Sequence, residues 1–149
     1  MLWRRCLWMG LMGMGLATSA LGQWLVTPQE AQASQEAPVP PETRSVPEQG
    51  APRVSLLSPD ISSTVRRPTR IQVRFEATAP AAIRPETFRV LYGSFRLDIT
   101  ERVTAASQVT ALGIDVAEAS LPPGSHRLLI EIQDTQGRIG RRTVGFVVE

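Results

Sequence analysis

The sequence has one cysteine, one histidine and no lysine among its 149 residues. The cysteine is Cys6, so a chain that loses its N-terminal segment has no disulfide, no thiol nucleophile and no cysteine-ligated metal. The histidine, His126, has neither a second histidine nor a nearby cysteine with which to form a typical transition-metal site. Packing must therefore stabilise the protein, and we expect no cofactor.

Motifs for catalysis are missing as well. The chain has no G-x-S-x-G turn, no phosphate-binding loop and no recognisable pair of carboxylates. Ser125 and His126 are adjacent, but neighbouring side chains on a strand point to opposite faces, which argues against a catalytic pair. His126 is explained as a strand-start residue after a Pro-Gly corner. The sequence predicts that the protein is not an enzyme.

A calcium site would need several carboxylates brought together by loops. No D-x-D or D-x-N-x-D spacing is present, and the D-x-x-G pattern that starts at Asp134 is better explained by a side chain that caps a turn. We therefore predict no metal site among the four aspartates, which are Asp60, Asp98, Asp115 and Asp134.

The first 26 residues resemble an export segment. Arg4 and Arg5 precede an uncharged run from Cys6 to Val26, which is the order of charged and apolar regions in a signal peptide. The two arginines also fit the core of a twin-arginine signal, although the usual residues around the pair are missing. Residues 1–26 are predicted to direct the chain out of the cytoplasm, to the periplasm or the extracellular space.

The fate of this segment is open on sequence grounds. Small residues allow cleavage before Gln23, and the tripeptide Ala31-Gln32-Ala33 allows cleavage before Ser34. The run is also long enough, at about 20 residues, to stay uncut as a membrane anchor with its arginines on the cytoplasmic side. Residues 27–52 follow, rich in Pro, Glu, Gln, Ala and Ser, and their composition predicts a disordered linker.

From residue 53 onward apolar and polar residues alternate, which predicts β-strands. The stretch 70–78 places Ile71, Val73 and Phe75 on one face, and Tyr92 to Phe95 predicts a tight hairpin with Phe95, Leu97 and Ile99 inward. Residues 101–112 fit a strand, a short helical turn or a loose crossover equally well. About seven short strands predict an all-β fold, an antiparallel two-sheet sandwich over residues 53–149.

The end of the chain carries a family resemblance. Leu-Pro-Pro-Gly-Ser-His at 121–126 leads into one alternating stretch, and Asp-Thr-Gln-Gly at 134–137 turns into the last one. With the preceding strands, this order resembles bacterial Ig-like domains of exported proteins, except that Arg138 replaces their frequent asparagine. The resemblance implies an Ig-like sandwich that serves as a spacer, an adhesive module or an accessory domain of an envelope enzyme.

Arginine supplies all 16 basic residues, which fits either recognition of phosphate and carboxylate groups or a bias in codon usage. Acidic residues interleave with them, the formal net charge is only +2, and charged strand edges also prevent aggregation. Two clusters are nevertheless candidates for binding an anion or a partner: Arg66, Arg67, Arg70, Arg74, Arg138, Arg141 and Arg142.

The function predicted from these features is a non-catalytic exported module for structural or protein-protein interactions in the bacterial cell envelope, with another envelope protein as its partner. The alternative is an accessory domain that binds anionic envelope polymers or lipid head groups through the arginine clusters. An uncut N-terminal segment would attach either one to the membrane. Export argues against nucleic acid as a partner.

Overall fold

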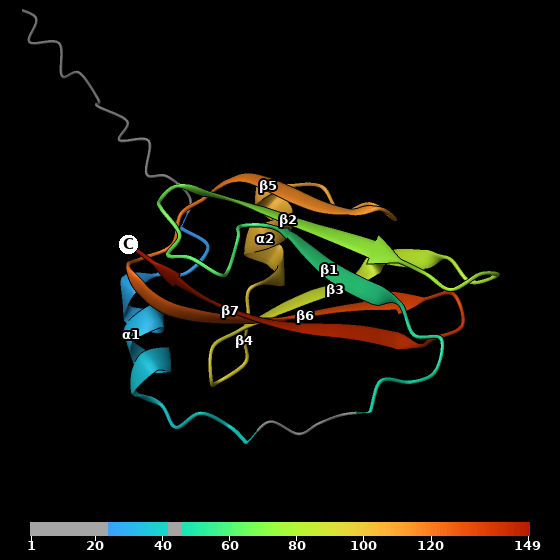
Figure 1. Cartoon of the computed structure of the whole chain (residues 1–149), viewed down its shortest axis with the longest axis horizontal. Helices are drawn as coiled ribbons and strands as arrows, with labels where there is room; N and C mark the ends of the chain where they lie inside the picture. The colour runs from blue at the N-terminus through green and yellow to red at the C-terminus, as the bar shows by residue number, and fades with distance from the viewer. Residues whose placement is uncertain (1–23, 42–45) are drawn as a thin grey trace, which may run out of the picture.

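The computed structural model describes residues 24–41 and 46–149. Its strands form two antiparallel sheets that pack face to face, with helix α1 at the end of the sandwich near the C-terminus (Figure 1). One sheet has the order β1-β2-β5, formed by β1 (Arg53–Ser58), β2 (Thr69–Glu76) and β5 (Gly113–Ala119). The other has the order β4-β3-β6-β7, formed by β3 (Ile83–Tyr92), β4 (Leu97–Asp98), β6 (Gly124–Asp134) and β7 (Ile139–Val148). The predicted all-β, two-sheet architecture is confirmed at this level.

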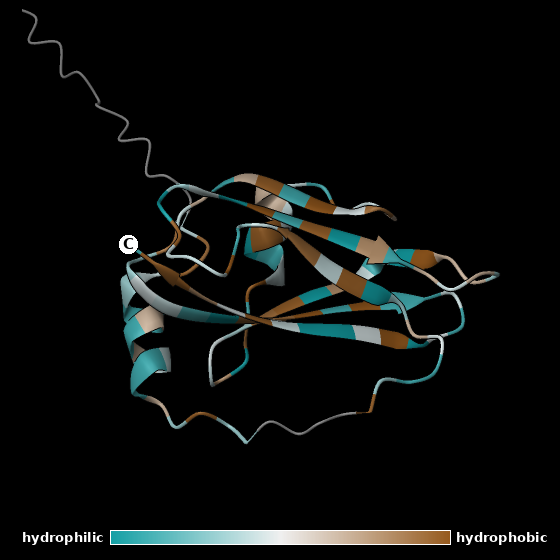
Figure 2. Ribbon diagram, in the orientation of Figure 1, coloured by the Kyte–Doolittle hydropathy of each residue, from teal (hydrophilic) through white to brown (hydrophobic). Residues whose placement is uncertain are grey.

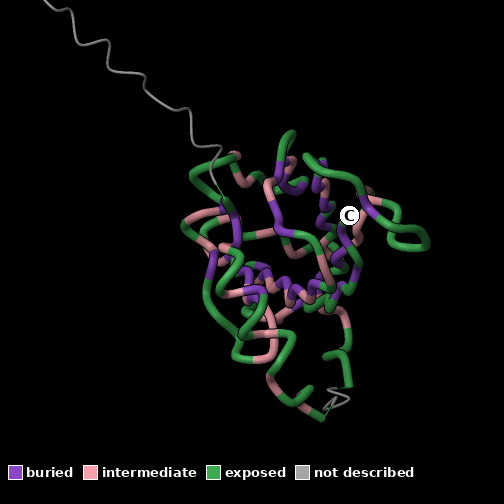
Figure 3. The backbone as a smooth tube through the Cα atoms, turned by 90° about the vertical axis from the view of Figure 1, so that its left-hand side faces the viewer, coloured by how far each residue is buried: buried purple, intermediate pink, exposed green. Residues whose placement is uncertain are grey.

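The core lies between the two sheets because strands such as β2 and β6 turn alternate side chains inward. In β2 the buried positions Ile71, Val73 and Phe75 alternate with more exposed polar residues, as predicted (Figure 2). Strand β6 does the same with Leu128, Ile130 and other residues of its inner face. Buried segments line the interior of the sandwich, and exposed ones lie in its loops (Figure 3).

The hairpin after β3 differs in part from the prediction. The chain turns between Gly93 and Arg96, and Ile99 is buried as expected. Phe95 and Leu97, however, were predicted to point inward and are 70% and 37% exposed. The reason is that Phe95 lies in the turn itself, while β4 is a two-residue strand at the edge of its sheet.

The ambiguous stretch after this hairpin begins with a helix. Helix α2 covers Thr100–Ala106 in the connection between the two sheets, and its inner side chain, Val103, is buried in the core. Of the three structures that the sequence allowed for residues 101–112, the short helix is therefore the one observed for the first half. The chain then reaches β5 through an irregular segment closed by hydrogen bonds between Thr110 and Gly113.

The region predicted as a disordered linker contains helix α1, which spans Pro28–Glu36. Thr27 and Glu30 form a capping box at its start: the Glu30 amide donates to the Thr27 hydroxyl, and the Thr27 amide donates to the Glu30 carboxylate. The prediction of disorder is wrong for this part of 27–52, because the capping box and burial on the domain compensate for the low apolar content. Residues 42–45 lie outside the described part of the chain.

The chain just before α1 belongs to the domain too. Leu25 and Val26, which the sequence reading assigned to the export segment, are 2% and 0% exposed and lie in the core with Ala31 of α1. The Leu25 amide donates a hydrogen bond of 3.2 Å to the Ser120 carbonyl beside the end of β5. Residues ahead of the predicted boundary at residue 53 therefore contribute to the core.

The rest of the predicted export segment, residues 1–23, lies outside the described residues. Among the helices that the structure describes, none has the length and apolar character needed to cross a membrane.

If the segment before α1 is part of the core, replacing Leu25 by Ala should lower the free energy of unfolding by about 2 to 4 kcal/mol, the usual cost of such a cavity. Urea denaturation followed by circular dichroism measures this change. Leu112, which is 80% exposed, provides the matched control, and Leu112→Ala should change the free energy by less than about 0.5 kcal/mol. Equal effects of the two substitutions would contradict the placement of Leu25.

Candidate functional site

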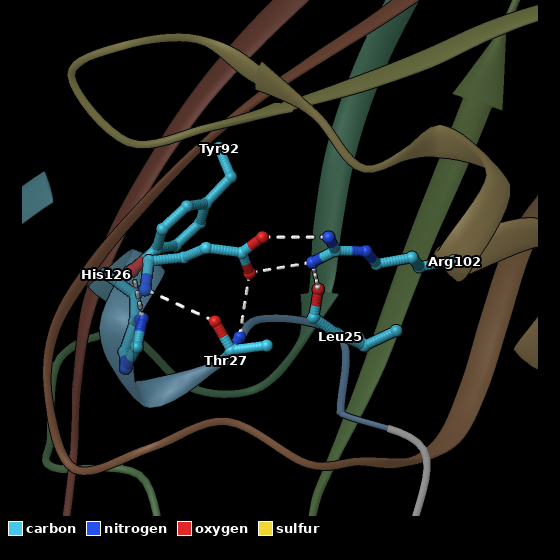
Figure 4. A network of polar contacts seen from close by, with 6 residues as sticks. Leu25, Thr27, Tyr92, Arg102 and His126 are labelled. Atoms are coloured by element: carbon cyan, nitrogen blue, oxygen red, sulfur yellow. Dashed lines mark hydrogen bonds and ion pairs between the residues drawn. The ribbon is translucent and has the colours of Figure 1, made fainter. Parts of the chain in front are cut away.

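A group of polar contacts joins α1 to α2. Arg102 of α2 donates from its two terminal nitrogens to the two carboxylate oxygens of Glu30, at 2.7 and 2.8 Å (Figure 4). The same guanidinium also donates to the Leu25 carbonyl at 3.2 Å. Because one side chain contacts both Glu30 and the core segment before α1, it fixes the N-terminal part of the domain to the crossover between the sheets.

This contact changes the titration of the carboxyl group. Hydrogen bonds from Arg102 lower the pKa of Glu30 from its usual 4.5 to about 2, with smaller contributions from Thr27, and partial burial opposes them. The Glu30 side chain is 25% exposed, so part of its interaction with the guanidinium is shielded from water. The Glu30 carboxylate therefore stays charged at neutral pH, where it accepts the two hydrogen bonds from Arg102.

His126, the one candidate for acid-base chemistry, lies in the core. The Tyr92 hydroxyl is 2.9 Å from Nδ1 of His126, and Nε2 is 2.7 Å from the Pro122 carbonyl. The carbonyl can only accept, so Nε2 carries the proton and Nδ1 accepts from Tyr92. Burial lowers the pKa of His126, although the bond to Pro122 opposes the shift. Both ring nitrogens are occupied, and Ser125 points to the exposed face, as predicted.

Asp134 is buried and caps the turn between β6 and β7. Its Oδ1 accepts from the amides of Gln136 and Arg138 at 2.9 and 3.0 Å, and its Oδ2 pairs with the Arg138 guanidinium at 2.8 Å. Burial alone would raise the pKa of Asp134, but the hydrogen bonds from Arg138 and Gln136 outweigh it and the pKa is lowered. The predicted turn cap is confirmed.

The other three aspartates have separate local partners. Asp60 accepts from Ser62, Asp98 from Thr100, and Asp115 from Arg70. Within residues 24–41 and 46–149, no three side chains of the metal-binding types come together.

The arginines at the entry of β2 lie near the end of β7. Arg66 pairs with the Glu149 carboxylate at 3.2 Å, and Arg67 donates to the Glu149 backbone oxygen at the same distance. With Trp24 they line a recess of about 810 Å³, which Glu118 and Glu149 also border. Arg70 forms a two-pronged pair with Asp115 on the neighbouring strand, so the carboxylates offset much of this positive charge.

The second predicted cluster lies at the other end of β7. Arg138 is engaged by buried Asp134, and Arg141 pairs with Glu131 of β6 at 2.6 Å. The structure therefore does not gather the seven predicted arginines into one surface. Four of them pair with carboxylates, and exposed Arg74 lies on β2 in the other sheet.

A second recess has a different character and was not predicted. It has a volume of about 830 Å³ and lies between the end of α1, the loop 61–64 and the outer face of β6 and β7. Three apolar side chains on it are exposed, namely Val39 (69%), Ile61 (42%) and Val147 (47%). Six residues with hydroxyl groups also line it: Ser34, Ser62, Ser63, Thr64, Ser94 and Ser125. We call this surface the valine-isoleucine recess.

Sequence reasoning missed this recess because its apolar residues come from three distant segments. Val39 lies in the predicted linker, Ile61 in a turn-rich loop and Val147 on the outward face of the last strand. An isolated valine inside a polar linker is the one signal that could have drawn attention to it. Hydrogen bonds hold the end of α1 next to β6 and the β3-β4 turn, because Gln35 donates to the Ser125 carbonyl and Ser94 donates to the Ser34 hydroxyl and carbonyl.

Comparison with known proteins gives no relative. No protein-family model matches the chain, and no curated protein or solved structure is detectably similar to it. The evidence for function therefore comes from the chain's own residues.

The Glu30 pKa leads to a pH-dependent prediction. A carboxyl whose pKa is lower in the folded state stabilises the fold above its unfolded pKa, and this contribution is lost as the pH falls. Wild type should exceed Glu30→Gln in free energy of unfolding by about 1 to 2 kcal/mol at pH 6, since water screens part of the pair. The difference should shrink between pH 4.5 and 2.

Urea denaturation of both proteins at pH 6 and pH 3 measures this. Glu101→Gln, on the exposed side of α2, is the control and should have little effect at either pH. A Glu30→Gln deficit that stays the same at both pH values would show that the carboxylate charge does not hold α1 in place.

Proposed function

We propose that the chain is a non-catalytic, exported Ig-like module that mediates structural or protein-protein interactions in the bacterial cell envelope. The strand order supports the Ig-like assignment. If the seven strands are lettered A to G, the sheets contain A-B-E and D-C-F-G, whereas an antibody constant-type domain contains A-B-E-D and C-F-G. The two arrangements differ in the sheet that the fourth strand joins.

The observation that carries the proposal is the contrast between engaged polar groups and exposed apolar ones. Of the described side chains that could perform chemistry, His126 is held by Tyr92 and Pro122, and Asp134 by the last turn. In the valine-isoleucine recess, by contrast, Val39, Ile61 and Val147 have no apolar cover of their own. A surface with exposed apolar side chains and no free catalytic group favours binding of a partner over catalysis.

The composition of the recess favours a protein as the partner. An apolar centre surrounded by polar groups that can form hydrogen bonds is the usual anatomy of a protein interface. The lining of the recess combines both kinds of group, because it includes three exposed aliphatic side chains and six serine or threonine hydroxyls. Its adjacent strand edge is partly closed, because the Val65 amide donates to the Val147 carbonyl at 2.8 Å. Side chains, rather than an added strand, would therefore supply most of the contact at this end of β7.

The alternative function, binding of anionic polymers or lipid head groups through arginine, remains a prediction. It has less support because Arg66, Arg70, Arg138 and Arg141 already face carboxylates. A guanidinium in such a pair must exchange its partner to bind a new anion, which reduces the net gain.

Site-specific crosslinking tests the proposed function. A photoreactive amino acid at Val147 should form adducts with a discrete envelope protein when the full chain is expressed in its own host. The same amino acid at Leu112 is the control, because Leu112 is even more exposed but lies away from the valine-isoleucine recess. A further substitution, Ile61→Asp, should reduce the Val147 adduct several-fold by placing a charge among the exposed apolar side chains of the recess.

Equal protein adducts from both positions would contradict the proposal, because exposure alone would then explain them. Adducts with lipid or glycan alone would contradict it too and would favour the alternative. Circular dichroism of the Ile61→Asp protein distinguishes lost contact from lost folding.

A further inference from the structure

One edge of the four-stranded sheet exposes backbone groups that have no partner among the described residues. Strand β7 is the outer strand in the order β4-β3-β6-β7, so β6 pairs with only one of its sides. We infer that the open part of this edge, from Arg141 to Gly145, receives an extended, acidic segment of the protein partner as an added strand. This inference rests on the proposed function and deepens it, because it states the conformation and the charge of the segment that binds beside the valine-isoleucine recess.

The register of β7 shows which of its backbone groups face outward. The antiparallel ladder with β6 runs the length of β7 without a bulge. At its far end the Val147 carbonyl accepts from the Val65 amide, so the backbone groups of Val147 point away from β6. Because this direction alternates along a strand, the backbone groups of Arg141, Thr143 and Gly145 also point away from β6.

These outward groups are open between Arg141 and Gly145. Within the described part of the chain, no hydrogen bond engages the outward amides and carbonyls of Arg141, Thr143 and Gly145, and all three residues are exposed. The outer strand β5 of the other sheet differs, because the Ser107 hydroxyl donates to the Asp115 carbonyl and covers part of that edge. An extended peptide satisfies such a row of donors and acceptors by pairing as a further strand.

The arginines of β7 determine which kind of segment fits. Arg141 pairs with Glu131 of β6, whereas exposed Arg142 has no ion pair within the described part of the chain. A carboxylate opposite Arg142 on an added strand would form a cross-strand pair of opposite charges, which stabilises a sheet, and a basic residue there would be repelled. The charges that discourage indiscriminate edge pairing therefore favour an acidic partner.

A second copy of β7 does not fit this edge. Antiparallel self-pairing centred on Arg142 would place two guanidinium groups opposite each other. Self-pairing centred on Thr143 or further along would bring part of the second copy beside Val147, where Val65 already lies. The partner strand therefore belongs to a different protein.

The open edge leads into the valine-isoleucine recess. Gly145 borders the recess together with Ile61 and Val147. A segment that pairs with Thr143 and Gly145 therefore brings its next residue to the recess, where an aliphatic side chain can contact Ile61 and Val147. The main chain of the partner would supply affinity through hydrogen bonds, and its alternate side chains would supply specificity.

Amide hydrogen exchange measured by NMR on the full chain, kept in mild detergent, tests the inference. The probe is a peptide of about seven residues in which glutamate alternates with valine, and the control peptide has lysine in place of glutamate. Without peptide, the Thr143 and Gly145 amides should exchange rapidly, and the Val144 amide, which faces β6, should exchange slowly. The glutamate peptide should slow exchange at Thr143 and Gly145 by about tenfold or more, and the lysine peptide should not.

Substitutions on the edge separate main-chain pairing from charge. Thr143→Pro removes an outward N–H that the fold does not use and should weaken binding of the glutamate peptide by about tenfold, whereas Thr143→Ala should not. Arg142→Glu should weaken binding several-fold, and Arg74→Glu, at an exposed position of β2 in the other sheet, is its control. Circular dichroism of each variant checks its fold, and exchange in the wild type needs no substitution.

Equal protection by the two peptides, or no protection at Thr143 and Gly145, would overturn the inference. Binding that a folded Thr143→Pro protein retains in full would overturn it too. Crosslinking through Val147 in the host is scored separately. Amide protection without a protein adduct at Val147 would leave the edge inference standing while the proposed function fails, and an adduct without amide protection would do the reverse.

Discussion

The two-pronged contact between Arg102 and Glu30 joins parts of the chain that are far apart in sequence. It ties α1 to α2, and through the Leu25 carbonyl it also holds the segment that places Leu25 and Val26 in the core. Charge-assisted hydrogen bonds of this kind are stronger and more directional than neutral ones. The end of the sandwich near α1 therefore depends on a helix that precedes the first strand.

The position of α1 on the sandwich also shapes the surface proposed for recognition. The end of α1 forms one wall of the valine-isoleucine recess, and its contacts with the β3-β4 turn and with β6 set the position of that wall. At the other end of β7, the buried carboxylate of Asp134 is paired with Arg138 within the domain. The domain thus combines a rigid frame, in which polar groups have partners, with an apolar surface that has none within the described chain. A substitution that detaches α1 from the sandwich should therefore also weaken binding of the proposed partner at the valine-isoleucine recess.

The sequence predicted the features that depend on local pattern. Alternation in β2 and β6, and the capped turn at Asp134, follow from spacing that a single segment contains. It did not predict α1, because the polar, proline-containing composition of residues 27–52 favours disorder. It placed Leu25 and Val26 in the export segment because they continue its apolar run. The valine-isoleucine recess was missed for another reason: it exists only when three distant segments meet, and no periodicity records such a meeting.

Native-state hydrogen exchange tests most directly whether residues 24–36 belong to the cooperative unit. The Leu25 amide, bonded to Ser120, and the Ala31 amide, bonded to Thr27, should be compared with core amides such as that of Ile130. If the N-terminal segment is integral, the Leu25 amide should exchange with a free energy close to that of global unfolding. Exchange at the rate of a frayed chain end, with the Ile130 amide still protected, would contradict the account.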